Sequence, residues 1–75
     1  MPQRRDRLLL ALGARVRRLR EAKSWTQEGL AEKADLDRSY IAAIETGLRN
    51  PSVKAAAKLA RGLGVSLSDL FENVG

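Results

Sequence analysis

Apolar residues that recur every three or four positions constrain this chain more than any other feature of its sequence. Between Asp6 and Lys23 they place one apolar stripe on a helix whose opposite side carries arginines: Leu9, Leu12, Val16 and Leu19. Similar short runs follow, and Gly or Pro residues separate them. The pattern predicts an all-α fold of five short helices, at about residues 6–23, 27–34, 38–45, 52–62 and 67–73.

Polar residues mark where the later helices begin, and the predicted N-caps are Thr26, Asp37, Ser52 and Ser66. Gly47 is expected to end the third helix in a left-handed conformation. Asp35 is expected to adopt the left-handed backbone of a tight turn, with Leu36 pointing inward as its apolar anchor. Gly29 stands where Glu would complete a capping box, and we expect that close packing requires it.

The length of 75 residues allows a single domain, covering residues 1–75. A domain this short buries only about 60% of its extended-chain surface, which favours self-association. The last predicted helix carries more apolar side chains than it can hide in so small a core: Leu67, Leu70, Phe71 and Val74. We expect some of them to form a homodimer interface across a two-fold axis, the alternative being that all four complete the monomer core.

The formal net charge of +5 predicts attraction to a polyanion, and nucleic acid is the commonest partner of a basic chain. Cys and His are both absent, so the usual zinc ligands are missing and no metal or other cofactor is expected. No acidic pair lies in a setting that would tune catalysis, so we expect neither an enzyme nor a small-molecule ligand. Without a membrane span or signal peptide, and without Cys, a cytoplasmic location is expected and no membrane contact.

The segment from Thr26 to Glu45 has the pattern of helix, tight turn and helix, with Ala31 and Leu36 where two crossing helices must approach closely. With its Leu-Arg, Thr-Gln, Leu-Ala, Ile-Glu-x-Gly, Asn-Pro-Ser and Leu-Gly-Val-Ser motifs, the chain resembles the Xre family of helix-turn-helix regulators, which includes lambdoid phage repressors and Cro. The stretch LDRSYIAAIETGLRNPS is most similar to the controller proteins of restriction-modification systems. Three positions depart from the family pattern: Trp25 replaces Leu, Gly29 replaces Glu and Asp35 replaces Gly.

This resemblance implies a five-helix, lambda-repressor-like DNA-binding domain. It further implies a sequence-specific transcriptional regulator that binds a palindromic operator in double-stranded DNA as a homodimer, with RNA polymerase as a further partner. The alternative is an antitoxin or another protein-interaction module that uses the same helices to hold a partner. Side chains able to contact DNA favour the regulator: Gln27, Arg38, Arg49 and Asn50.

In such a fold the third helix lies in the major groove, so the candidates for reading bases are Arg38, Ser39, Ala42, Ala43 and Thr46. The Arg38 guanidinium can donate to guanine O6 and N7 together, although a phosphate contact is the alternative. The candidates for contacts to the DNA backbone are Gln27, Tyr40, Arg49, Asn50 and Lys54. Gln27 lies beside the free N–H groups of a helix start, whereas Tyr40 could instead be half-buried in the core.

The resemblance also implies a structural ion pair between Arg20 and Glu45 that ties the first helix to the end of the third. An exposed pair of this kind would contribute at most about 1 kcal/mol. The remaining arginines of the N-terminal region are expected to solvate its outer face and not to form a second DNA-binding surface: Arg4, Arg5, Arg7, Arg15, Arg17 and Arg18.

Overall fold

The computed structural model describes residues 6–75, and these form helices without any strand. The helices are α1 (Arg7–Ala22), α2 (Gln27–Ala34), α3 (Arg38–Glu45), α4 (Val53–Leu63) and α5 (Leu67–Leu70). The predicted all-α class is confirmed, and the first four helices fall within one residue of their expected bounds. Arg4 and Arg5 lie outside the described residues.

The last helix is shorter than predicted, because it ends at Leu70 and not at residue 73. Phe71 already leaves the helical conformation, and Asn73 has a left-handed φ of 62° that turns the chain away. A helix cannot continue through such a residue. The C-terminal residues therefore form an irregular segment that folds back along α1.

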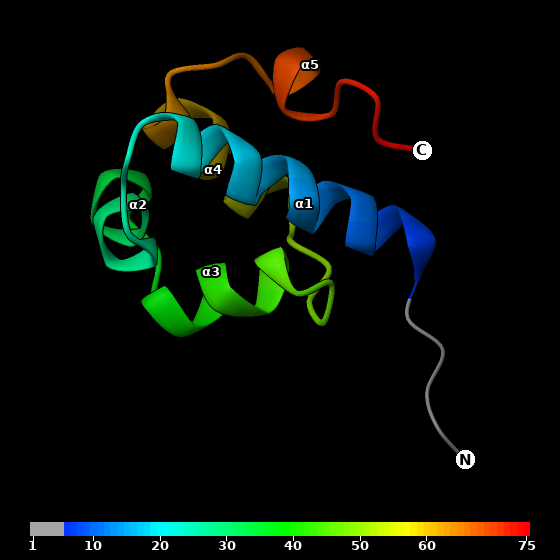
Figure 1. Ribbon diagram of the computed structural model, residues 1–75, viewed down its shortest axis with the longest axis horizontal. Helices are drawn as coiled ribbons and strands as arrows, with labels where there is room; N and C mark the ends of the chain where they lie inside the picture. The colour runs from blue at the N-terminus through cyan, green and yellow to red at the C-terminus, as the bar shows by residue number, and fades with distance from the viewer. Residues whose placement is uncertain (1–5) are drawn as a thin grey trace.

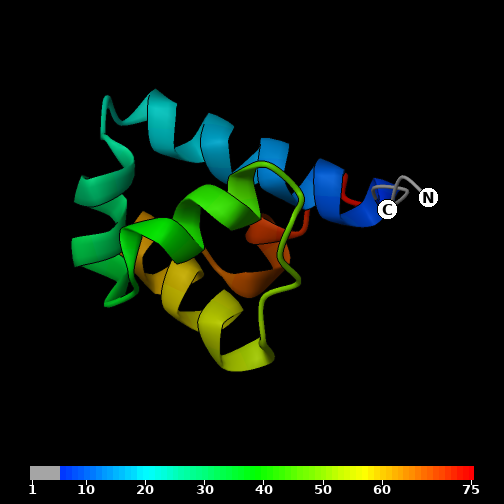
Figure 2. The ribbon, with the colours of Figure 1, turned by 90° about the horizontal axis from the view of Figure 1, so that it is seen from below.

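The helices pack around one core, with α1 lying across α3 and also contacting α5 (Figure 1). α2 contacts both α3 and α4, and Figure 2 shows α2 and α3 meeting at an angle at one end of the molecule. The largest fully buried side chains come from every helix: Val16, Leu30, Ile41, Ile44, Leu59, Leu63 and Leu70. This arrangement leaves the side of α3 that faces away from α1 at the surface.

Local hydrogen bonds confirm most of the predicted caps. The hydroxyls of Thr26, Ser52 and Ser66 each accept a bond from a backbone N–H three residues later, at 3.0 Å. The expectation was wrong for Asp37, whose side chain makes no capping bond although its backbone occupies the N-cap position. Its carboxylate is directed elsewhere, toward a surface hollow described below.

Two glycines differ in what surrounds them. Close packing at Gly29 was expected wrongly, because a Cβ there would lie 3.4 Å from the Thr26 Oγ1 atom, which is ordinary contact. The close approach occurs instead at Gly13, where a Cβ would overlap the backbone carbonyl oxygen of Ile44. Gly13 therefore lets α1 and α3 pack backbone against backbone.

Arg15 does not solvate the outer face of α1, contrary to expectation. Its Nη2 and Nε atoms donate to the backbone carbonyl of Asp69 at 2.9 and 3.3 Å, and Nη2 lies 3.7 Å from the Glu72 carboxylate. The C-terminal segment covers this part of α1, which is why the side chain finds partners there. Arg17 behaves as expected, since it is exposed and pairs with Glu21 one turn along the helix.

The four apolar residues at the C-terminus divide into two groups. Leu70 is fully buried within its own chain, which contradicts its assignment to a dimer interface, and Val74 packs half-buried against the core. Leu67 and Phe71 remain 41% and 42% exposed. They leave an apolar surface on α5 and at its end. Among the described residues, no helix is both long and apolar enough to cross a membrane.

Candidate nucleic-acid interface

The turn between α2 and α3 has the geometry that the sequence predicts. Asp35 adopts φ 56° and ψ 50°, and the next residue, Leu36, donates its backbone N–H to the Ala31 carbonyl at 2.9 Å. The Leu36 side chain packs against the core, and Ala31 is buried where the helices cross. Asp therefore replaces Gly here without breaking the turn, since a short polar side chain tolerates the left-handed region.

α3 buries Ile41 and Ile44 and turns its other sides outward. Arg38 and Ser39, at its amino end, are exposed, and Ala42 and Ala43 are half-buried one turn later. The Arg38 guanidinium has no hydrogen-bond or ion-pair partner within the part of the chain that the structure describes. Thr46 is also exposed, but its hydroxyl donates back to the carbonyls of Ala42 and Ala43 at 3.0 and 3.2 Å. These positions make α3 a ridge with a long cationic side chain at its start.

A network of three side chains joins α1, α2 and α3. Arg20 donates from Nε and Nη2 to the two carboxylate oxygens of Glu45, at 2.7 and 2.9 Å. Gln27 donates from Nε2 to Oε1 of the same carboxylate at 3.1 Å, and Arg20 also donates to the Trp25 carbonyl at 2.7 Å. The Gln27 amide is thereby held at the amino end of α2 by one of its two N–H groups.

The pair of Arg20 and Glu45 is partly buried, and so is better shielded from water than the exposed pair that the sequence analysis considered. Only 11% of the Arg20 side chain and 2% of the Glu45 side chain are exposed. The pKa of Arg20 is raised above its usual value, mainly by the hydrogen bonds to Glu45, which outweigh the opposing effect of partial burial. Because the pair is bidentate and shielded on most sides, breaking it should cost more than the ~1 kcal/mol of an exposed pair, so it holds the ends of these helices together.

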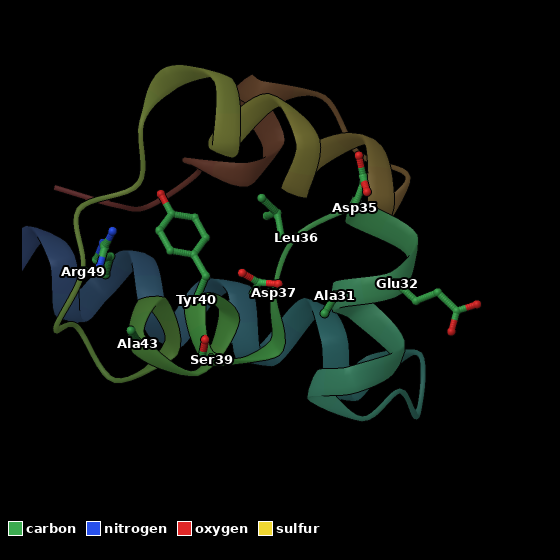
Figure 3. Close-up of a pocket in the computed structure, with 9 residues that line it drawn as sticks. All are labelled: Ala31, Glu32, Asp35, Leu36, Asp37, Ser39, Tyr40, Ala43 and Arg49. Atoms are coloured by element: carbon green, nitrogen blue, oxygen red, sulfur yellow. The ribbon is translucent and has the colours of Figure 1, made fainter.

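A hollow lies on one side of α3, against the turn and the loop that leads to α4 (Figure 3). Its volume is about 760 Å³, and it is lined by Ala31, Glu32, Asp35, Leu36, Asp37, Ser39, Tyr40, Ala43 and Arg49. The half-buried Tyr40 forms one wall, with its hydroxyl accepting a bond from the Ser52 backbone N–H at 3.3 Å. The Arg49 guanidinium carbon lies 5.1 Å from the centre of the same ring.

A second hollow lies on the other side of α3, between the amino ends of α2 and α3. It is lined by Arg20, Thr26, Gln27, Glu28 and Arg38. α3 therefore projects between two depressions, each with at least one cationic side chain in its wall. The remaining predicted backbone contacts, Asn50 and Lys54, are exposed in the loop after α3 and at the start of α4.

Two features of this surface escaped the sequence analysis. One is the hydrogen bond from Gln27 to Glu45, which only the crossing of α2 and α3 creates. The other is the free carboxylate of Asp37 beside Ser39, which looked like an ordinary helix cap. The described residues contain no group of three or more acidic, His or Cys side chains that could hold a metal ion.

These elements define the helix-turn-helix architecture, in which a second helix is held across a first by a tight turn. The profile of a family described as helix-turn-helix matches residues 16–70. The chain belongs to this family.

Within the family, the similar proteins include controller proteins, as the sequence of α3 led us to expect. The control protein C.MunI from a Mycoplasma species is 39% identical over 66 residues, covering 87% of this chain and 89% of the relative. The crystal structure of the restriction-modification controller protein C.AhdI from Aeromonas hydrophila has a TM-score of 0.82 and 44% identity, covering 84% of this chain and 96% of that one. The controller protein C.Esp1396I bound to a 19 base pair DNA duplex has a TM-score of 0.83 and 38% identity, covering 92% of each chain.

Proposed function

We propose that this protein is a sequence-specific DNA-binding transcriptional regulator of the restriction-modification controller type, which binds a palindromic operator as a homodimer in the cytoplasm. One observation carries the proposal: α3 is an exposed ridge with the unpaired Arg38 at its amino end, flanked by a hollow on each side. The major groove of B-DNA accepts a helix between two sugar-phosphate strands. The ridge fits the groove, with Gln27 on one side of α3 and Arg49 on the other directed toward the two strands.

The relatives support the same function. C.Esp1396I is recorded both on a 19 base pair duplex and as a tetramer with its natural 35 base pair operator. The present chain shares the fold of C.Esp1396I over 92% of its length, and the 38% identity supports a similar function as well as a similar fold. The helix-turn-helix family that the chain belongs to is one of DNA-binding regulators, which agrees with this function.

The amino end of α3 carries the sequence readout in this proposal. Arg38 donates to guanine O6 and N7, and Ser39 can donate or accept beside it. Ala42 and Ala43 are small enough to accept a thymine methyl group or to let the helix approach the bases closely. Thr46, whose hydroxyl donates back within the helix, is the last candidate at the carboxyl end of α3.

The contacts to the DNA backbone lie on either side of this ridge. Gln27, held by Glu45, donates to a phosphate at the amino end of α2, where the helix dipole also favours an anion. Arg49, Asn50 and Lys54 contact the opposite strand, together with the Tyr40 hydroxyl. These contacts supply most of the affinity and make it dependent on salt.

Self-association places two copies of α3 on one face of the DNA. Leu67 and Phe71 are the exposed apolar residues that we assign to the dimer interface, with the partly buried Val74 at its edge. A two-fold dimer sets its recognition helices about 34 Å apart, one turn of DNA, and so requires a palindromic site. Transcription is then blocked, or RNA polymerase recruited, according to where the operator lies.

Selection of bound sites from random DNA tests the proposal directly. The wild-type protein is expected to select a palindrome, and Arg38→Ala to lose guanine discrimination worth about 1–3 kcal/mol at one position of each half-site. Arg18→Ala removes the same charge from an exposed position on α1 and should leave the consensus unchanged. Failure of the wild type to enrich any sequence would remove the regulator function.

A further inference from the structure

Asp37 presents a carboxylate that none of the residues in the described part of the chain uses. It occupies the N-cap of α3, yet its side chain accepts no bond from the helix. Its backbone carbonyl already accepts the N–H groups of Tyr40 and Ile41, both at 3.1 Å. Across residues 6–75, its carboxylate has neither a hydrogen-bond donor nor a cation as partner. The residue is exposed, and Figure 3 shows the carboxylate facing the hollow beside Tyr40 and Ser39.

The surroundings of this carboxylate make it costly in a DNA complex unless the DNA supplies a donor. Asp37 immediately precedes Arg38, and its hollow is shared with Ser39 and Ala43, which lie on the groove side of α3. Phosphates near this surface repel a negative charge, because each carries a full charge of the same sign. A hydrogen-bond donor on a base edge would offset that repulsion.

Only some base edges can provide the donor. In the major groove, guanine presents the acceptors N7 and O6, and thymine presents the acceptor O4 and a methyl group. Adenine offers its N6 amino group next to the acceptor N7, whereas cytosine offers the N4 amino group alone. A carboxylate accepts hydrogen bonds and cannot donate any at neutral pH. Cytosine is therefore the base that Asp37 fits best.

We propose that Asp37 is a specificity-determining residue that accepts a hydrogen bond from the N4 amino group of a cytosine in each operator half-site. This inference rests on the proposed function, since it requires α3 to lie in the major groove. The carboxylate of Asp37 then accepts a hydrogen bond beside the guanidinium of Arg38, which donates two. Together they match a cytosine and a guanine in the same half-site, and they disfavour a site in which these two bases are exchanged.

The test is selection of bound sites from random DNA with wild type, Asp37→Asn and the control Asp35→Asn. Asn is also a good N-cap residue, so Asp37→Asn should fold with an unchanged melting temperature. Its amide pairs with adenine N6 and N7, so we expect the preferred base at one position of each half-site to change from cytosine to adenine. Binding to a cytosine-containing operator should fall at least about fivefold, while binding to unrelated DNA rises because a negative charge is lost.

Asp35→Asn is the control, because it makes the same change of charge and shape at another residue that lines the hollow. Unlike Asp37, Asp35 has a partner in the protein, with its carboxylate 3.6 Å from the Lys58 ammonium. Asn tolerates the left-handed conformation at that position, so its consensus should equal that of the wild type. If Asp37→Asn raises affinity for all sequences and leaves the consensus unchanged, Asp37 is only a repulsive surface charge and the inference is wrong. If the wild type selects no consensus, the proposed function fails and this inference fails with it.

Discussion

Gly13 and Gly29 both lie inside helices, but the cost of a side chain differs between them. At Gly29 a methyl group meets only ordinary contacts, so Gly29→Ala should stabilise the protein by about 0.5–1 kcal/mol through helix propensity. At Gly13 the same methyl group meets the backbone of Ile44 and Glu45, and Gly13→Ala should destabilise it by about 1–3 kcal/mol. Urea unfolding of both variants measures the difference, and equal effects would show that α1 and α3 are not in backbone contact.

Single residues were predictable from the sequence where their roles depend on near neighbours. Thr26 caps its helix, and Asp35 takes the left-handed turn position, because both choices are settled within a few residues of chain. Asp37 has the same local pattern as Thr26 but does not cap. Its side chain lies instead against the hollow beside Tyr40, which exists only after α3 and the following loop have packed.

The polar contacts that the structure describes between α1 and the C-terminal segment come from Arg15. Arg15 holds the carbonyl at the end of α5 with a charged donor, and such bonds typically contribute about 1.5–3 kcal/mol. Because Arg15 is partly exposed, we expect Arg15→Ala to lower the free energy of unfolding by about 1–2 kcal/mol. Denaturant unfolding measures this loss, and amide exchange should rise first in residues 67–74.

The control for this prediction is Arg17→Ala, on the same helix. Arg17 forms an exposed pair with Glu21, which contributes less than about 0.5 kcal/mol. Equal losses in the two variants would mean that the bond from Arg15 to Asp69 does not hold α5 in place.

Among the helices, those with strong apolar periodicity and clear caps were predictable almost to the residue, as α2 and α3 show. α5 was not, because its apolar residues continue to Val74 although the backbone turns at Asn73. The bond from Arg15 to Asp69 spans 54 residues of sequence and leaves no local pattern. The end of the chain is therefore fixed by tertiary contacts that the apolar pattern does not encode.

The interface as a whole comes from segments that are separate in sequence. The residues that we propose to read bases all lie on α3 or at its C-cap, and the structure leaves Arg38 and Ser39 exposed, as such a role would require. The two hollows were not predictable, since each combines α3 with a different neighbour. A free ridge between two depressions is a property of the assembled domain.

The proposed dimer is a property of the whole molecule that can be tested separately from folding. Phe71 is 42% exposed, so Phe71→Ser should change the stability of the monomer little. It should weaken the dimer more, because a two-fold interface contains the substituted residue from both copies. We expect the dimer dissociation constant to rise at least about tenfold, equivalent to about 1.4 kcal/mol, measured by analytical ultracentrifugation. Binding to a palindrome should weaken, while binding to a single half-site stays unchanged.

Val53→Ser is the control, because it removes another exposed apolar side chain, 82% exposed at the start of α4, and should leave self-association intact. If Val53→Ser dissociates the dimer and Phe71→Ser does not, the dimer interface lies at α4 and its assignment to Leu67 and Phe71 is wrong.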